Sequence, residues 1–276
     1  MNKLTVVASL VMLSYQGAAA QTFEVVASGE HAFGPNETQA QACDLALSKA
    51  KKNALIRHFG ELVGQKSMLE CDSSIQKATG NDCELFESSW SLVNSNGFIK
   101  GSKAVSKSVG FSETQRANVC EINATFVIDE FSGKPDSSFQ TSVSLKNGVT
   151  LREGDSPVIT IKSNKAAFHL VYFWAPYHDR ENYYRVFPNA VDEQSSAVTE
   201  LTVPSPNQTK TYTLDVSLPE GANFSSEYLI LLSFKESVNT APDTISEAGF
   251  FSWLQSIERD LWTQDKISYR IIGDSI

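Results

Sequence analysis

The chain has 276 residues, of which 41% are hydrophobic and 20% are charged, and its formal net charge is -9. This length suits one large domain or two ordinary ones. Acidic residues are in excess, and Lys and Arg are scattered without forming a basic block, so nucleic acid is excluded as an expected partner.

Residues 1–20 have the pattern of a secretory signal peptide. Lys3 precedes an apolar run at 4–13, and three alanines at 18–20 end the segment before Gln21. The run is shorter than the about 20 apolar residues that span a bilayer, so a retained membrane anchor is the weaker alternative. We therefore expect an exported protein, periplasmic or secreted, that starts near Gln21 and has no integral membrane span.

The four cysteines, Cys43, Cys71, Cys83 and Cys120, all lie in the first half of the chain. An even number in an exported chain is typical of a disulfide framework. The metal alternative needs closer ligand pairs, such as Cys-x-x-Cys, and no His lies near these residues in sequence, so we expect no metal. Of the three pairings that four cysteines allow, we favour Cys71 with Cys83, closing a short polar loop, and Cys43 with Cys120, joining a helix to a strand.

Residues 21–130 are predicted to form a small α/β domain that opens with a strand and a long helix. The strand is expected at about 23–33, where β-forming residues are frequent. Thr38 followed by Gln41 is a capping-box pattern, and apolar residues then recur at helical spacing to about Val63. Many of these residues are alanines, which allow a helix to lie close to a sheet.

Two further strands are predicted at about 98–111 and 118–129, where apolar and polar residues alternate. A half-buried antiparallel pair with one helix packed on it accounts for this order of elements.

The segment ASGEHAFGPNETQAQACDLALSKAKKNAL resembles the N-terminal domain of the flagellar assembly protein T and related small α/β domains of bacterial envelope proteins. The resemblance rests on two features: an opening strand that contains a glycine, and the Ala-rich helix that follows it. It implies a binding and assembly module without catalytic residues.

The polar segment 131–141 contains Gly, Pro and Ser and is the predicted linker. Residues 142–276 are expected to form an antiparallel β-sandwich with a terminal helix, because short strands alternate with Pro and Gly turns. The fold class is therefore α+β. The expected elements are strands at about 159–161, 167–174, 183–187, 197–204, 210–221 and 227–236, a helix capped at Thr244, and a closing edge strand at 266–272.

The order of segments GDSPVITIKSNKAAFHLVYFWA, YYRVFPN, LTVPS and LPEGANFSSEYLILLSF resembles a family of bacterial domains of unknown function, number 4384 in that series. That family has a Leu-Phe-Pro-Asn signature, and residues 186–189 here are Val-Phe-Pro-Asn, which is a conservative departure. The resemblance brings no catalytic residues and implies an accessory domain of exported or envelope proteins.

The densest aromatic stretch, residues 170–189, is predicted to be a hairpin that contributes to a core, because large aromatic side chains are usually buried. The expected core residues are Tyr172, Phe173, Trp174, Tyr184, Val186 and Phe187. Tyr177, His178 and Tyr183 flank the turn and are the candidate exposed binding surface.

No His-Glu-x-x-His, Gly-x-Ser-x-Gly or P-loop motif occurs in the sequence, and no cofactor is implied. We expect a non-enzymatic interaction or assembly module whose partners are other envelope or surface proteins, with flagellar or secretion apparatus among the candidates. The alternative is a secreted carbohydrate-binding or hydrolytic protein with a glycan partner, which would use the turn aromatics with Asp179 and Glu181.

Overall fold

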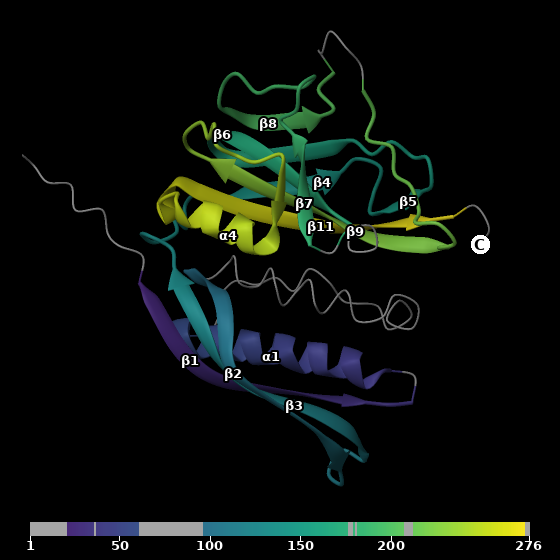
Figure 1. Cartoon of the computed structure of the whole chain (residues 1–276). Coiled ribbons are helices and arrows are strands. Elements are labelled where there is room, and N and C mark those ends of the chain that lie inside the picture. The colour runs from purple at the N-terminus through teal and green to yellow at the C-terminus, as the bar shows by residue number, and fades with distance from the viewer. Residues whose placement is uncertain are drawn as a thin grey trace, which may run out of the picture.

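The computed structural model describes residues 21–35, 37–60, 96–175, 179, 181–206 and 212–273. The described chain is mostly sheet, with a long helix after the first strand, in agreement with the α+β prediction (Figure 1). No described helix has the length and apolar character that crossing a membrane requires.

The first part of the chain forms a three-stranded antiparallel sheet with one helix packed on it. The sheet order is β1–β3–β2, so β3 is central. The order strand, helix, strand, strand is as predicted. The elements are β1 (Thr22–Phe33), α1 (Gln39–Phe59), β2 (Gly97–Ser112) and β3 (Ala117–Glu130).

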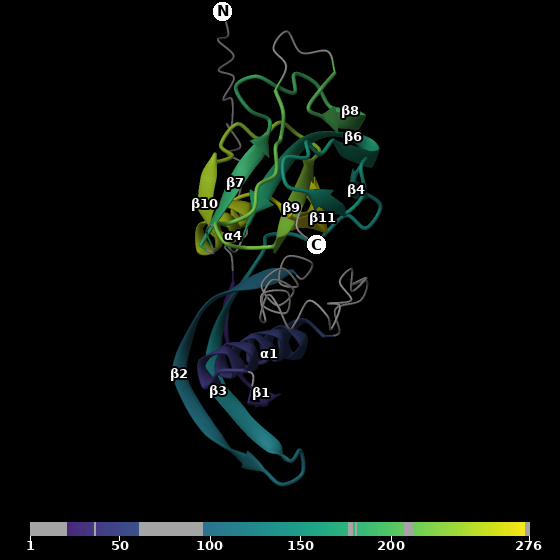
Figure 2. The ribbon, with the colours of Figure 1, turned by 90° about the vertical axis from the view of Figure 1, so that its right-hand side faces the viewer.

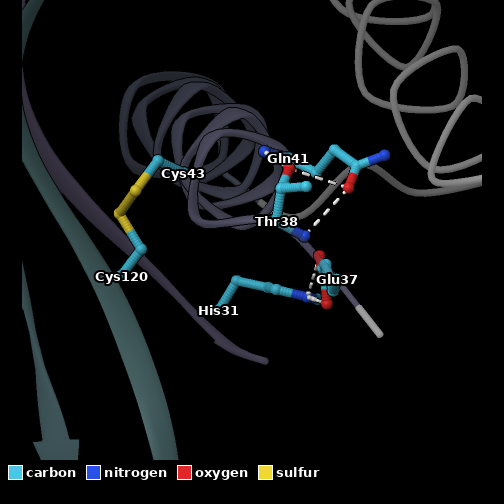
Figure 3. Close-up of a disulfide and its surroundings, with 6 residues drawn as sticks. All are labelled: His31, Glu37, Thr38, Gln41, Cys43 and Cys120. Atoms are coloured by element: carbon cyan, nitrogen blue, oxygen red, sulfur yellow. Dashed lines mark hydrogen bonds and ion pairs between the residues drawn. A yellow bond between two sulfur atoms is a disulfide. The ribbon is translucent and has the colours of Figure 1, made fainter. Parts of the chain in front are cut away.

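The predicted capping box opens α1 (Figure 3). The Thr38 side chain accepts a hydrogen bond from the backbone N–H of Gln41, and the Gln41 side chain accepts one from the backbone N–H of Thr38. Both bonds satisfy N–H groups that the first helical turn leaves without a partner. The helix ends at Phe59, before the predicted Val63, and Gly60 follows in a positive-φ conformation (φ 85°) that favours glycine.

Close packing of α1 on β1 depends on Gly29. A Cβ atom at this position would lie 2.2 Å from the backbone oxygen of Ala46 and 2.3 Å from the backbone nitrogen of Ala50. Ala46 and Ala50 are themselves fully buried. The absence of a side chain on the strand and the small side chains on the helix therefore bring the two backbones into direct contact.

The second part of the chain forms a larger sheet with the order β10–β7–β6–β9–β11–β5, to which β4 and β8 attach by pairing with β6. Two short helical segments precede its last strand in sequence. The elements are β4 (Thr141–Leu145), β5 (Thr150–Arg152), β6 (Ile159–Trp174), β7 (Asn182–Phe187), β8 (Val198–Val203), β9 (Phe224–Phe234), β10 (Thr244–Ser246), α4 (Glu247–Gln255), the 3-10 segment η1 (Arg259–Leu261) and β11 (Trp262–Ile272).

The long strand β6 organises this sheet. Its first half pairs with β4 and β8, and its second half pairs with β7 and β9. Along the second half, Tyr172 and Trp174 face one core and Val171 faces another, as the alternation of side chains in a strand requires. Both faces of the second half of β6 are therefore buried.

The two cores lie on opposite faces of the sheet. We call the first the aromatic cluster, in which α4 packs on the sheet and the Phe250 and Tyr172 rings meet edge to face at 5.2 Å. Its largest members are Phe98, Phe131, Tyr172, Trp174, Tyr183, Tyr228, Phe234, Phe250, Phe251 and Trp262. We call the second the aliphatic cluster, which joins residues of β4, β6, β7, β8, β9 and β11, among them Val143, Ile161, Val171, Phe187, Val203, Leu231 and Ile271.

Several predicted elements of this second part are wrong in detail. The predicted strands at 159–161 and 167–174 are one strand, and the described residues of the predicted strand at 210–221 form none. Backbone hydrogen bonds from Val216 to Asp155 and from Gly154 to Val216 join that segment to its neighbour, but no ladder develops. β-forming residues alone do not produce a strand without a paired partner.

The C-terminal elements also differ from prediction. Ser246, and not Thr244, is the N-cap of α4, because Thr244 belongs to β10, and the helix ends at Gln255. The last strand, β11, is not an edge strand, because β5 pairs with it on the side away from β9. The pairing of β5 with β11 is parallel, so the sheet is mixed.

The two sheets share no strand pairing, but their side chains meet in the aromatic cluster. Phe98 of β2 stacks on Phe251 of α4 at 5.6 Å between ring centroids, and Phe131 meets Trp262 edge to face at 5.5 Å. Phe131 is the first residue of the predicted linker 131–141 and is buried. This segment therefore contributes to packing, and the domain boundary drawn through it stays a prediction.

Substitution of Gly29 by Ala is expected to lower the free energy of unfolding by about 2–3 kcal/mol, because backbone atoms of a helix cannot move aside as a side chain can. The matched control is Gly110→Ala on β2, where an added Cβ meets no atom within 4 Å, and the change there should stay within about 0.5 kcal/mol. Urea unfolding followed by far-UV circular dichroism measures both. Equal effects at the two positions would contradict the close contact.

Candidate functional site

Of the three residues predicted to form an exposed binding surface, the structure describes Tyr183. Tyr183 is only 3% exposed, and its ring packs edge to face on Trp174 and Phe250, with centroid distances of 6.1 and 5.4 Å. Its assignment to an exposed binding surface is therefore wrong. Tyr177 and His178, the other two candidates, lie outside the described residues.

A β-bulge determines which cluster Tyr183 faces. Phe187 pairs with Val171, whereas Arg185 pairs with Tyr172, so Val186 is an extra residue in β7. An extra residue reverses the alternation of side chains beyond it. Tyr183 consequently faces the aromatic cluster and Phe187 the aliphatic cluster.

The core predicted for the hairpin is confirmed at Tyr172, Trp174 and Phe187, which are all buried. Phe173 and Val186 are partly buried and pack against the aliphatic cluster. Tyr184 was expected in the core but is 39% exposed, so this prediction is wrong. The bulge at Val186 turns Tyr183, rather than Tyr184, toward the aromatic cluster.

Asp179, a carboxylate of the hydrolytic alternative, stabilises the turn. Its Oδ1 accepts hydrogen bonds from the backbone N–H groups of Glu181 and Asn182, and its Oδ2 accepts one from the Tyr184 hydroxyl at 2.6 Å. The bond from Tyr184 contributes most to a pKa of about 2 for this carboxyl. Asp179 therefore has the role of an Asx turn residue.

The predicted disulfide between Cys43 and Cys120 is present and joins α1 to β3, with 5.2 Å between the Cα atoms (Figure 3). Cys71 and Cys83 lie outside the described residues, so their pairing stays a prediction. Within the described ranges, His, Cys, Asp and Glu form no group of three or more that could hold a metal ion.

Three of the four histidines have structural contacts. His31 pairs with Glu37 at 3.1 Å, and His58 pairs with Glu130 at 3.0 Å. His169 is buried between the Ser233 hydroxyl and the Val198 carbonyl, and its burial lowers its pKa. These contacts give His31, His58 and His169 structural roles.

The most exposed regular element is β2. Every residue from 101 to 111 is exposed, although the strand is paired with β3 along its length. Among the described strands β2 pairs with β3 alone, so it is an edge of its sheet. Three apolar side chains project from it into solvent: Val105 is 50% exposed, Val109 39% and Phe111 66%.

The second part of the chain contains an apolar cavity of about 380 Å³ beside the aliphatic cluster. Its apolar wall includes Ile159, Phe173, Val186 and Leu229. The exposed residues Asp215 and Ser217 line it from the segment that follows Tyr212, and they mark its opening to solvent. The volume falls in the range of small-molecule sites.

Glu227 places a buried carboxyl in this cavity. It is 3% exposed and lies opposite Tyr269 in the β9–β11 pairing, and its Oε2 accepts a hydrogen bond of 2.7 Å from the Tyr269 hydroxyl. None of the ion pairs within the described residues includes Glu227. Burial raises its pKa to about 7, against the lowering effect of the Tyr269 hydrogen bond.

Glu227 was not among the candidate site residues predicted from the sequence. A signal was nevertheless present, because Glu227 lies in phase with Leu229 and Leu231 on a strand whose two faces are apolar. A carboxylate at such a position is uncommon unless it is paired or functional.

Glu227 is expected to make the protein less stable at higher pH. Its folded-state pKa of about 7 lies above the ordinary value of 4.5, so the folded state binds more protons than the unfolded state between these values. The stability of the wild type relative to Glu227→Gln should therefore fall by about 2 kcal/mol between pH 5 and pH 8. Urea unfolding of both proteins at the two pH values measures this difference, since other titrating groups cancel. A difference that stays constant with pH would exclude the raised pKa.

Comparisons of the chain with protein-family models, with curated proteins and with solved structures returned no match.

Proposed function

We propose that this chain is an exported bacterial protein that acts as a non-enzymatic interaction module in an envelope or cell-surface assembly, with flagellar and secretion apparatus among the candidates. In this proposal residues 21–130 form the interaction domain and residues 142–276 form a β-sandwich accessory domain. The signal-peptide pattern, the two family resemblances and the Cys43–Cys120 disulfide support it.

The observation that carries the proposal is the exposed edge strand β2. An edge strand offers backbone N–H and C=O groups to which an extended segment of a partner can add as a further strand. Such an edge is a liability in an isolated protein, and Lys side chains and bulges commonly protect it. The first half of β2 has the second of these protections, because register shifts occur near Gly101 and Ala104.

The second half of β2 lacks these bulges. Residues 106–112 pair in continuous register with 117–123 of β3. Val109 pairs with Cys120, whose side chain is bonded to α1, so Val109 projects on the helix side of the sheet. The α1 helix lies over β1 and β3 (Figure 2) and makes few contacts with β2. Val109 and Phe111 are accordingly exposed. A partner strand added here gains both backbone hydrogen bonds and apolar contact.

A double substitution, Val109→Asp with Phe111→Asp, is expected to abolish partner binding while changing the free energy of unfolding by no more than about 0.5 kcal/mol per site, because both side chains are exposed. Val149→Asp is the matched control, since Val149 is 51% exposed and lies beside β5 in the second part of the chain.

The measurement is photo-cross-linking in intact bacterial cells, with a photoreactive residue in place of Ser108 or, as the control position, in place of Val149. The proposal predicts a discrete adduct from position 108 that disappears in the double variant and persists in Val149→Asp. Equal adducts from both positions, or an adduct that survives the double substitution, would refute β2 as the docking edge.

A further inference from the structure

The cavity beside the aliphatic cluster has a chemistry that the proposed interaction through β2 does not use. It belongs to the second part of the chain, whereas β2 belongs to the first, and it does not depend on what binds at that edge. Its volume of about 380 Å³ is more than twice the roughly 150 Å³ at which an apolar cavity admits benzene.

The lining of the cavity selects the charge of a ligand. Its walls are apolar, and its ionisable residues are Glu227, Tyr269 and the exposed Asp215 at the opening. No Lys, Arg or His is among the lining residues that the structure describes. An anionic head group would therefore meet two carboxyl groups without a compensating cation, which is unfavourable in an apolar site.

We propose that this cavity binds a small, mostly apolar molecule that carries a protonated amine, with the ammonium group beside the Glu227 carboxylate and the apolar body against Ile159, Phe173, Val186 and Leu229. The ammonium supplies the opposite charge that Glu227 otherwise lacks among the described residues. The Tyr269 hydroxyl holds Oε2 in place by donating to it. Asp215 at the opening attracts the same charge.

Binding of the amine is linked to pH through Glu227. Its pKa of about 7 in the unliganded protein means that the carboxyl is mostly protonated at pH 5.5 and mostly ionised at pH 8. The facing hydroxyl of Tyr269 stays protonated across this range, because burial raises its pKa well above 10. The pKa of Asp215 is lowered by its hydrogen bond from Ser156, so its charge does not change. Amine affinity therefore rises with pH, by at least about tenfold from pH 5.5 to pH 8.

The test uses three probes of matched shape: 2-phenylethylamine, 2-phenylethanol and phenylacetate. Each is titrated into the full mature protein at pH 5.5 and pH 8, and binding is followed by ¹H–¹⁵N NMR and calorimetry. We expect saturable binding of the amine at pH 8, weaker binding of the alcohol and none of the carboxylate. The Glu227→Gln variant should lose at least about tenfold in amine affinity and bind the alcohol as before.

Glu220→Gln is the matched control, because Glu220 is exposed and lies outside the cavity lining. It should leave every affinity unchanged within twofold. Failure to bind any probe, equal affinity for amine and alcohol, or an amine affinity that does not change with pH in the wild type would each overturn the proposal. The wild-type comparison needs no variant, so it decides the matter even if Glu227→Gln does not fold. Loss of β2 docking would leave these affinities unaffected, so the two proposals fail separately.

Discussion

The direct contact between α1 and β1 at Gly29 is the constraint on which the first part of the molecule depends. The backbone of the helix lies so close to the strand that a single Cβ would overlap it, and the Cys43–Cys120 disulfide fixes the same helix to β3. A helix held in this position covers β1 and β3 and leaves residues 101–111 of β2 exposed. The exposed edge that we propose as a docking site therefore follows from where the helix lies on the sheet.

The second part of the molecule depends on β6, whose two faces belong to different cores. Its aromatic face meets α4, and through Phe98 and Phe131 it also connects with the first sheet. Its other face meets residues of β4, β5, β7, β8, β9 and β11, and the cavity lies beside that packing. The strand β6 therefore contributes one face to the packing between the two sheets and the other face to the cluster beside the proposed ligand site.

Local sequence signals predicted much of the fold. The Thr38–Gln41 pattern identified the start of α1, and alternation identified β3, because both depend on residues that are neighbours in sequence. Tyr183 was expected to be exposed because it flanks the turn, but it is buried against Trp174 and Phe250, and a position beside a turn does not reveal such packing. The cavity could not be predicted because Glu227, Asp215 and Tyr269 come together only in the fold.

The central claim is that residues 106–112 of β2 receive a partner strand. Hydrogen exchange of backbone amides tests it most directly, comparing the free protein with the same protein in an assembly isolated from cells. The account predicts slower exchange within 106–112 in the assembly, because the added strand supplies hydrogen bonds to the open edge. Unchanged exchange in 106–112, with new protection confined to another surface, would contradict it.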